Sequence, residues 1–494
     1  MCTYTIFCFG GCPMNKRQVI ESEIISMINE NILTYGDTVP SIRKMAKRYG
    51  ISVTPVIEAY RNLELQGIIK GKTKSGFIVI TPKVLPTGAP ITYSPENADV
   101  SFDTGKRKNH SPLESHKCSP DNNFEAENYD FNCASMTPSM IPCDTLIQHI
   151  IKTLRVEPEL LSVNPHGYDD PTLVNSIAWC MAHYRCIINK HEICITNNDF
   201  TLPLIFAIQS CLKPTQAVLL TAPCDKCHVN AARQTGHEVF YVNNSVGLRL
   251  NVNAVERILI RNPHIGCIII SPNFQPPSGI SMTSEDRRIL GEICAKYGVC
   301  IIEDDRNRYL SFDGVCPLPI KSAHPSNTIY IHSLSFPVMP HIQMHWTCPG
   351  KYADNFRAHR NRALASPPAF MQRSISSYLD SMQHKKDIFS IGESLGITCS
   401  RVKNAIAESF PEGVYVASPE GGCTLWVELP DIIDCTKVAD AAMTLGISIS
   451  TAGDYKAQGN WIVINFSTIA QNPMLIKGVY ELGNLICSMN DQKI

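Results

Sequence analysis

The sequence predicts a multidomain protein in which a winged helix-turn-helix precedes a large α/β domain and a small C-terminal α+β domain. Two observations lead to this architecture. Residues 36–77 divide at glycine and proline turn signals into helix, turn, helix and hairpin. Beyond residue 128, short β-branched runs alternate with helix-patterned segments, which is typical of a mostly parallel sheet covered by helices on both faces.

The first helix of the N-terminal module is expected to follow Pro40, with Ser41 accepting hydrogen bonds from the free amides of the first turn. Apolar residues then recur at helical spacing. This spacing leaves a basic face of Arg43, Lys44, Lys47 and Arg48. Gly50 ends the helix and supplies a tight turn.

The second helix is expected to have Thr54 as its cap and Pro55 at its first position, where the missing N–H costs nothing. Its apolar stripe faces inward, and Arg61 points outward. Strands at residues 68–70 and 77–80 follow, joined by a basic turn. Two helices at a short turn, followed by a basic wing, fit the major groove of B-DNA.

The charge of this module agrees with a polyanionic partner. Residues 14–82 contain ten Lys or Arg against six Asp or Glu, while the whole chain carries a net charge of −1. A solvated basic helix face is the alternative, but the turn and the lysine-rich wing favour double-stranded DNA. The predicted DNA contacts are Arg43, Lys44, Ser52, Thr54, Arg61, Lys72 and Lys74.

Residues 19–80 resemble the DNA-binding domain of the GntR family of bacterial regulators. The resemblance depends on the Pro-Ser-Ile-Arg phrase that begins at Pro40, on the Ala59–Tyr60 pair and on the glycine-bearing wing. Val53 stands where the family usually has a base-reading arginine, and Pro55 stands where it has threonine. The resemblance therefore implies DNA binding and leaves the operator sequence open.

Residues 1–13 form an apolar leader with no basic segment before it, so a secretory signal is not expected and Met14 is the more natural start. No apolar run reaches the length of about 18 residues that a membrane helix needs. We therefore expect a cytoplasmic protein without membrane contact.

The 21 cysteines are scattered, often within apolar runs, and are predicted to be reduced thiols. Cys224, Cys227 and His228 have the C-x-x-C-H spacing of a haem attachment site, which requires export. A redox pair or a metal site is the other interpretation.

Residues 83–127 are rich in proline, serine, asparagine and charge, and are predicted to form a flexible linker. Residues 128–395 are assigned to the large domain and residues 396–494 to the small one. Strands are expected at residues 192–196, 217–221, 239–242, 267–271, 299–303, 328–332 and 342–347, with a helix at 284–297. The small domain is expected to contain strands within 413–429 and at 447–450 and 461–466.

This second part resembles the fold-type I aminotransferases. Four phrases carry the resemblance, in the order the family has them: residues 129–138, 271–279, 301–305 and 330–335. Together with the N-terminal module, it is similar to the MocR-type subgroup of the GntR family. The resemblance implies a homodimer, a domain able to sense a small-molecule effector, and pyridoxal phosphate as the cofactor of the fold.

The cofactor positions implied by the resemblance are largely altered. Phe336, after Ser335, stands where the family has the lysine that forms the Schiff base. Gln343 replaces the phosphate-binding arginine, and Arg306 replaces a tyrosine. Of the usual residues, only Asp304, the partner of the pyridine nitrogen, is in place.

Two further positions agree with this loss. Asp199 lies at the helix start that would bind the phosphate, where it is best interpreted as a structural cap. No arginine follows Arg401 to bind a substrate carboxylate.

We therefore predict a DNA-binding regulator whose aminotransferase-like domain is catalytically inactive. Covalent attachment of pyridoxal phosphate is not expected, and its noncovalent binding is expected to be weakened. The alternatives are an enzyme with a relocated catalytic group, for which Lys321 and Lys351 are the nearest lysines along the chain, and a scaffold that has lost both activities.

Overall fold

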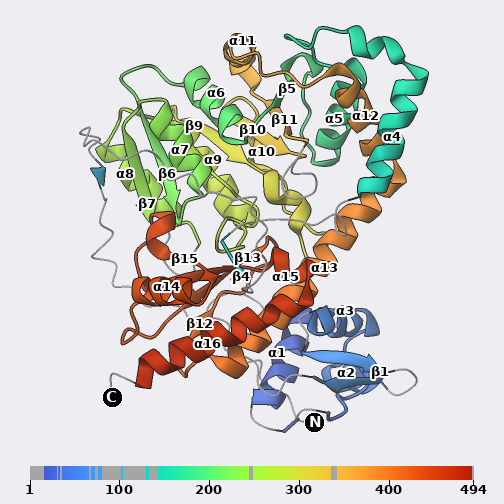
Figure 1. The fold of residues 1–494 in the computed structure, drawn as a ribbon, viewed down its shortest axis with the longest axis vertical. Helices are drawn as coiled ribbons and strands as arrows, with labels where there is room; N and C mark the ends of the chain where they lie inside the picture. The colour runs from blue at the N-terminus through green and yellow to red at the C-terminus, as the bar shows by residue number, and fades with distance from the viewer. Residues whose placement is uncertain are drawn as a thin grey trace.

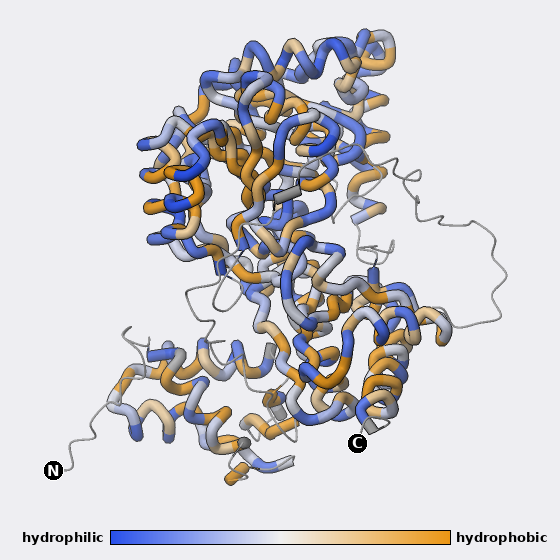
Figure 2. Tube along the Cα trace, turned by 90° about the vertical axis from the view of Figure 1, so that its left-hand side faces the viewer, coloured by the Kyte–Doolittle hydropathy of each residue, from blue (hydrophilic) through white to orange (hydrophobic). Residues whose placement is uncertain are grey.

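The computed structural model describes residues 16–29, 32–33, 36–65, 68–72, 76–80, 102–103, 129–132, 142–243, 249–334 and 342–491. They form an N-terminal module, a large α/β part and a small α+β part (Figure 1). Figure 2, coloured by hydropathy, shows the N-terminal module beside the small part and the large part beyond them. No helix of these residues is long and apolar enough to cross a membrane.

The N-terminal module is a winged helix-turn-helix, as predicted. Its elements are α1 (Lys16–Asn29), α2 (Ile42–Tyr49), α3 (Val53–Leu65), β1 (Ile69–Lys72) and β2 (Gly76–Val79). The strands pair antiparallel, with Ile69 opposite Val79. Apolar side chains of all five elements share one core, in which the rings of Tyr60 and Phe77 meet edge to face at 5.2 Å.

The turn between α2 and α3 is built mostly as predicted. Ser41 accepts a hydrogen bond from the backbone N–H of Lys44, and Gly50 adopts a left-handed conformation with φ of 61°. The prediction that Thr54 caps α3 is wrong, because this helix already begins at Val53. Pro55 is therefore the third residue of the helix and not the first. A proline is tolerated at this position because the first four N–H groups of a helix have no partner within the helix.

The large part is built on an eight-stranded sheet in the order β3-β7-β6-β8-β9-β10-β11-β5. The run from β7 to β10 is parallel, and β3 and β11 are antiparallel to their neighbours, which confirms the predicted mostly parallel sheet. The strands are β3 (Phe102–Asp103), β5 (Cys194–Asn197), β6 (Ala217–Ala222), β7 (Val239–Asn243), β8 (Ile265–Ile270), β9 (Cys300–Asp304), β10 (Thr328–Ser333) and β11 (Met344–Cys348).

Helices cover both faces of this sheet (Figure 1). Alternate strand residues belong to two separate apolar clusters, with Val218 and Ile269 in one and Leu219 and Ile268 in the other. The first cluster includes residues of α6 (Thr201–Cys211), α7 (Lys226–Gln234) and α11 (Ala353–Arg362). The second includes residues of α8 (Val252–Arg261), α9 (Ser284–Tyr297) and α10 (Ile320–Ala323).

The segment predicted to be a linker is not wholly without structure. Phe102 and Asp103 form β3, which pairs with Phe240 and Val239 at the edge of the sheet. Without this short strand, the backbone groups on the outer side of β7 would lack a ladder partner. The remainder of residues 83–127 lies outside the described part of the chain.

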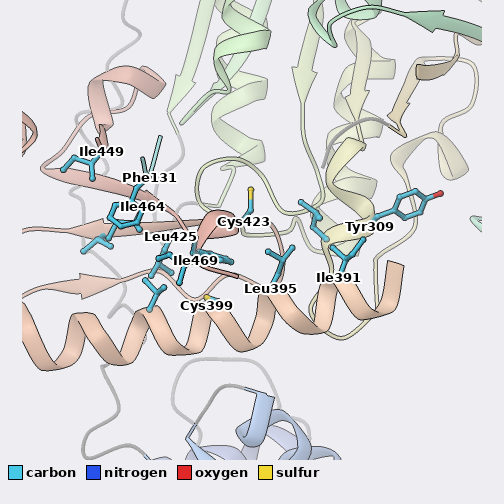
Figure 3. Close-up of a cluster of buried hydrophobic side chains, with 14 of the residues drawn as sticks. Phe131, Tyr309, Ile391, Leu395, Cys399, Cys423, Leu425, Ile449, Ile464 and Ile469 are labelled. Atoms are coloured by element: carbon cyan, nitrogen blue, oxygen red, sulfur yellow. The ribbon is translucent and has the colours of Figure 1, made fainter. Parts of the chain in front are cut away.

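The small part packs its own sheet against a long helix. The strands β12 (Tyr415–Val416), β13 (Thr424–Glu428), β16 (Trp461–Asn465) and β15 (Ser450–Thr451) form a sheet in that order. The helices α14 (Cys435–Thr444), α15 (Ser467–Gln471) and α16 (Ile476–Asp491) complete it. Figure 3 shows the apolar core that this sheet shares with α13 (Met382–Ser409).

The predicted boundary between residues 395 and 396 differs from the structure. It falls inside α13, a single continuous helix that contributes to the large part at its start and to the small part further on. In addition, β4 (Tyr129–Asp130) pairs with β14 (Ile447–Ser448), so residues 129–130 belong with the small part. The two parts therefore share one core rather than two separable ones.

The remaining helices of the large part lie at its far end (Figure 1). These are α4 (Cys143–Val156), α5 (Pro171–His183) and α12 (Ala369–Leu379), with the short helix η1 (Pro158–Ser162) after α4. The N-terminal module lies at the other end, where α3 contacts α13.

Candidate functional site

The structure has two candidate sites, and the first is the outer surface of the helix-turn-helix. Arg43 and Lys44 are exposed on α2, Ser52 is exposed in the turn, and Thr54 and Arg61 are exposed on α3. Of the predicted wing residues, Lys72 ends β1, but its side chain is not among the described ones, and Lys74 lies outside the described residues.

The outer face of α3 contains more than the sequence analysis singled out. Val56, Ala59, Tyr60 and Leu63 are buried on its inner face. The exposed residues recur with the same helical period around the rest of the helix: Val53, Thr54, Ile57, Glu58 and Arg61. Ile57 and Glu58 were missed, although their spacing from Val53 and Arg61 was sufficient to place them there.

The second candidate site lies at the carboxyl ends of neighbouring parallel strands. Asp304 ends β9, Ser271 follows β8, and His228 lies on α7 after β6. All three are at most 2% exposed. One carboxylate oxygen of Asp304, Oδ2, lies 2.7 Å from His228 Nε2 and accepts a hydrogen bond of 3.2 Å from the Ser271 hydroxyl. This edge of a parallel sheet is the usual place for a ligand in α/β folds.

Arg306 lies at the centre of this site. Its Nε atom is 3.3 Å from Asp304 Oδ2, and its Nη2 atom is 2.6 Å from a carboxylate oxygen of Asp225. The guanidinium carbon lies 4.5 Å from the centre of the Phe200 ring. Arg306 also donates its backbone N–H to the other oxygen of Asp304, at 3.1 Å. One cation therefore satisfies two carboxylates.

The electrostatics of the cluster keep both carboxylates charged. Burial alone would raise the pKa of Asp225, but the Arg306 guanidinium and His228 lower it to about 2. Burial would also raise the pKa of Asp304, but Arg306 and the hydrogen bond from His228 hold this pKa below its usual range. Asp225 also caps α7 through the backbone N–H of Cys227.

The start of α6 carries its own carboxylate. Asp199 accepts a hydrogen bond of 2.8 Å from the backbone N–H of Thr201, the first residue of α6, although the capping position itself is held by Phe200. The preceding carbonyl, that of Asn198, lies 2.7 Å from Nε2 of His345. An anion bound at this helix end would meet the negative charge of Asp199.

Three of the positions compared with cofactor-binding residues lie just beyond β10. Gln343 has a left-handed backbone with φ of 46° immediately before β11. Ser335 and Phe336 lie outside the described residues, and the predictions about them rest on the sequence.

Lys321 and Lys351, the two lysines considered as replacements for the Schiff-base lysine, lie near the amino end of β10, away from the site at its carboxyl end. Lys321 Nζ donates to the carbonyls of Pro325 and Thr328, each at 2.9 Å. Thr328 begins β10, whereas Ser333 ends it at the site, about 16 Å away for a strand of this length. Lys351 follows β11, whose last residue pairs with Tyr330 near the start of β10.

The C-x-x-C-H segment also contributes to this site. Cys224 is buried, and burial raises the pKa of both Cys224 and Cys227 well above the usual range, which disfavours reactive thiolates. The ligand atoms of Cys227, His228 and Asp304 lie within 4.8 Å of one another. The guanidinium of Arg306 already provides the positive charge beside Asp304, so a metal cation would have to compete with it.

The residues present do not fit pyridoxal phosphate. Asp304, the expected partner of a pyridinium, is already satisfied by His228, Ser271 and Arg306. The helix start that would receive the phosphate is occupied by Asp199. Both ends of the cofactor would thus meet groups that are already paired within the chain.

Comparisons with known proteins agree with the two-part architecture. Residues 16–79 match the family described as bacterial regulatory proteins, gntR family. The HTH-type transcriptional regulator YjiR of Escherichia coli is 24% identical over 91% of this chain and 93% of its own length. A second Escherichia coli HTH-type transcriptional regulator, YdcR, is 25% identical over 96% and 99%, respectively.

Solved structures share the fold of the second part. The multiple substrate aminotransferase of Thermococcus profundus superposes with a TM-score of 0.67 at 19% identity, over 74% of this chain and 92% of its own. The kynurenine aminotransferase of Pyrococcus horikoshii gives the same TM-score and coverage at 20% identity. The chain therefore joins a gntR-family helix-turn-helix domain to a fold-type I aminotransferase-like domain, which is the organisation of the MocR-type subgroup of GntR regulators.

Proposed function

We propose that this protein is a DNA-binding transcriptional regulator whose aminotransferase-like domain does not catalyse transamination. The exposed outer face of α3, within a domain that matches the gntR family, carries the first half of the proposal. The internal pairing of Asp304 with Arg306 and His228 carries the second half. A chromosomal operator would place the working protein in the cytoplasm.

The chemistry of the helix-turn-helix supports DNA as the partner. Its basic residues on α2 suit phosphate contacts, which position a protein on the duplex, and α3 presents side chains able to reach base edges. The names of the relatives YjiR and YdcR, both HTH-type transcriptional regulators, support the same role.

The site chemistry supports the loss of transamination. That reaction needs a Schiff-base lysine and a carboxylate free to hold the pyridine nitrogen. The sequence has Phe336 at the lysine position, and Asp304 already binds a guanidinium. The rival function, an enzyme with a relocated catalytic group, is opposed by the position of Lys321 and Lys351 at the far edge of the sheet.

Dimerisation is the first role we propose for this domain. The helices α4, α5 and α12 and the short helix η1 contact one another at the end of the large part. This group and its adjoining loop expose several large apolar side chains, namely Ile147, Ile151, Val156, Leu161, Trp179 and Ile187. An apolar surface of this kind marks an interaction site, and a second copy of the chain would place two helix-turn-helix modules on two half-sites.

Ligand sensing is the second role, and the contact between α3 and α13 offers a route for it. A ligand held between the large and small parts would bias DNA binding only if it bound two arrangements of α13 with different affinity. Such a ligand would stabilise one position of the N-terminal module over another.

Two measurements on the full-length protein test the proposal. Selection from random duplexes should enrich one operator sequence, and failure to bind any duplex would leave an interaction scaffold instead. The second measurement is the visible absorbance after pyridoxal phosphate is added, followed by borohydride reduction and peptide mass mapping. No visible band and no modified lysine are expected, whereas a single reduced lysine adduct would restore the enzyme interpretation.

A further inference from the structure

The outer face of α3 presents two apolar side chains that the module's own core does not use. Val53 is 43% exposed and Ile57 is 49% exposed. They lie one helical turn apart at the start of α3, beside the stripe that buries Val56 and Tyr60, and both remain open to solvent. Although α3 also contacts α13, this contact leaves both side chains open.

The surroundings of this apolar pair suit DNA better than a protein partner. Thr54, Glu58 and Arg61 share its face, and α2 presents exposed Arg43, Lys44 and Lys47. The module as a whole has a surplus of four positive charges, by ten basic against six acidic residues between positions 14 and 82. A partner complementary to this surface would be polyanionic and would present small apolar groups to Val53 and Ile57.

The major groove of B-DNA has one apolar group that side chains of this kind can contact, the C5 methyl of thymine. An arginine at position 53 would instead donate two hydrogen bonds to guanine. Valine can make no such bond, and it would leave the guanine acceptors without a protein partner. The exchange of arginine for valine therefore changes which base is favoured, and does not by itself weaken the interface everywhere.

We propose that Val53 and Ile57 read thymine methyl groups, so that each operator half-site contains two A·T pairs chosen by apolar contact. This inference rests on the proposed DNA-binding function and specifies its ligand. The two residues are separated by about 6 Å along the helix axis, which is close to two base-pair steps. The two thymines should therefore lie within about two steps of each other.

The test replaces single thymines of the selected operator with deoxyuridine, which removes only the methyl group. Full-length protein should bind the substituted duplex about fourfold more weakly at two nearby positions per half-site. This loss corresponds to about 0.8 kcal/mol for one buried methyl group. Replacing a substituted pair by one with 5-methylcytosine should recover part of the loss, because the methyl group returns to the same place in the groove.

Protein variants then connect each methyl group to a side chain. Val53→Ala should abolish the thymine preference at one position, and Ile57→Ala should abolish it at the other, since alanine keeps the helix and removes the apolar contact. Lys47→Ala is the matched control, because it should weaken both duplexes equally. Equal binding of thymine and deoxyuridine duplexes would overturn the inference, as would an unchanged preference in both alanine variants. Absence of any DNA binding would contradict the proposed function itself, and the inference with it.

Discussion

Arg306 is the residue that most changes the chemistry of the aminotransferase-like domain. A tyrosine in its place, as the family resemblance implies, would leave Asp304 available to a cofactor. The guanidinium instead forms ion pairs with both Asp304 and Asp225 and lies against the ring of Phe200. A single substitution thus supplies from within the chain the positive charge that the cofactor's ring nitrogen would bring.

Removal of this guanidinium should destabilise the protein strongly. Arg306→Ala leaves the buried carboxylate of Asp304 and the partly exposed one of Asp225 without their cation, and breaking a buried pair costs about 3–5 kcal/mol. Urea unfolding of the full chain measures the loss. The control is Arg288→Ala, whose ion pairs with Glu285 and Glu292 are exposed, and which should be close to neutral. A similar effect for both variants would contradict the role given to Arg306.

Three buried histidines predict how stability depends on pH. Burial lowers the pKa of His332, His345 and His384 to about 4 in the folded protein, from an ordinary value of 6.5. Between these values the unfolded chain binds more protons, so the free energy of unfolding should fall as the pH falls from about 6.5 to about 4. Each histidine contributes up to about 1.4 kcal/mol per pH unit in this window.

His384→Phe tests this dependence at one site. Phenylalanine can keep the edge-to-face contacts that His384 makes with Tyr309 and Tyr378, and it does not titrate. Urea unfolding between pH 7 and pH 5 should show a shallower slope in the variant than in the native protein. Parallel slopes would mean that His384 is readily protonated in the folded state.

At the scale of elements, the wing formed by β1 and β2 makes a separate prediction about DNA. Lys72→Ala combined with Lys74→Ala should weaken binding to all sequences alike. It should also reduce the salt dependence by roughly two units of slope, since two phosphate contacts are lost. Titrations at several salt concentrations measure the slope. The matched control replaces Lys385 and Lys386, both exposed on α13, and an equal change in that control would remove the wing from the interface.

At the scale of the whole molecule, the apolar end of the large part should form the dimer interface. Trp179→Lys should shift the protein towards monomer in sedimentation measurements at several concentrations, because it places a charge in an apolar surface. The control is Met443→Lys on α14, which has the same 68% exposure but lies in the small part. A protein that stays dimeric with Trp179→Lys has its interface elsewhere.

Much of the architecture could be predicted because local signals and tertiary structure agree. Ser41 and Gly50 delimit α2 as expected, and the predicted helix 284–297 is α9. Apart from β3, the strands of the large sheet lie within a few residues of their predicted positions, since a buried parallel strand is a continuous apolar run between turn signals. The altered cofactor positions were also visible in the sequence, because a residue type decides whether a Schiff base can form.

The partners of the polar residues were decided only by the tertiary structure. Asp225 and His228 come from the start of α7, whereas Asp304 and Arg306 come from the end of β9, and only the parallel order of β6, β8 and β9 brings these two segments together. The strand pairing of residues 102–103 and the continuity of α13 across the expected domain boundary are also long-range. The sequence by itself determined the elements and the residue types at the positions compared with the cofactor site, because these depend on local pattern and chemistry. The structure decided that Arg306 fills the site, because that depends on which side chains meet in space.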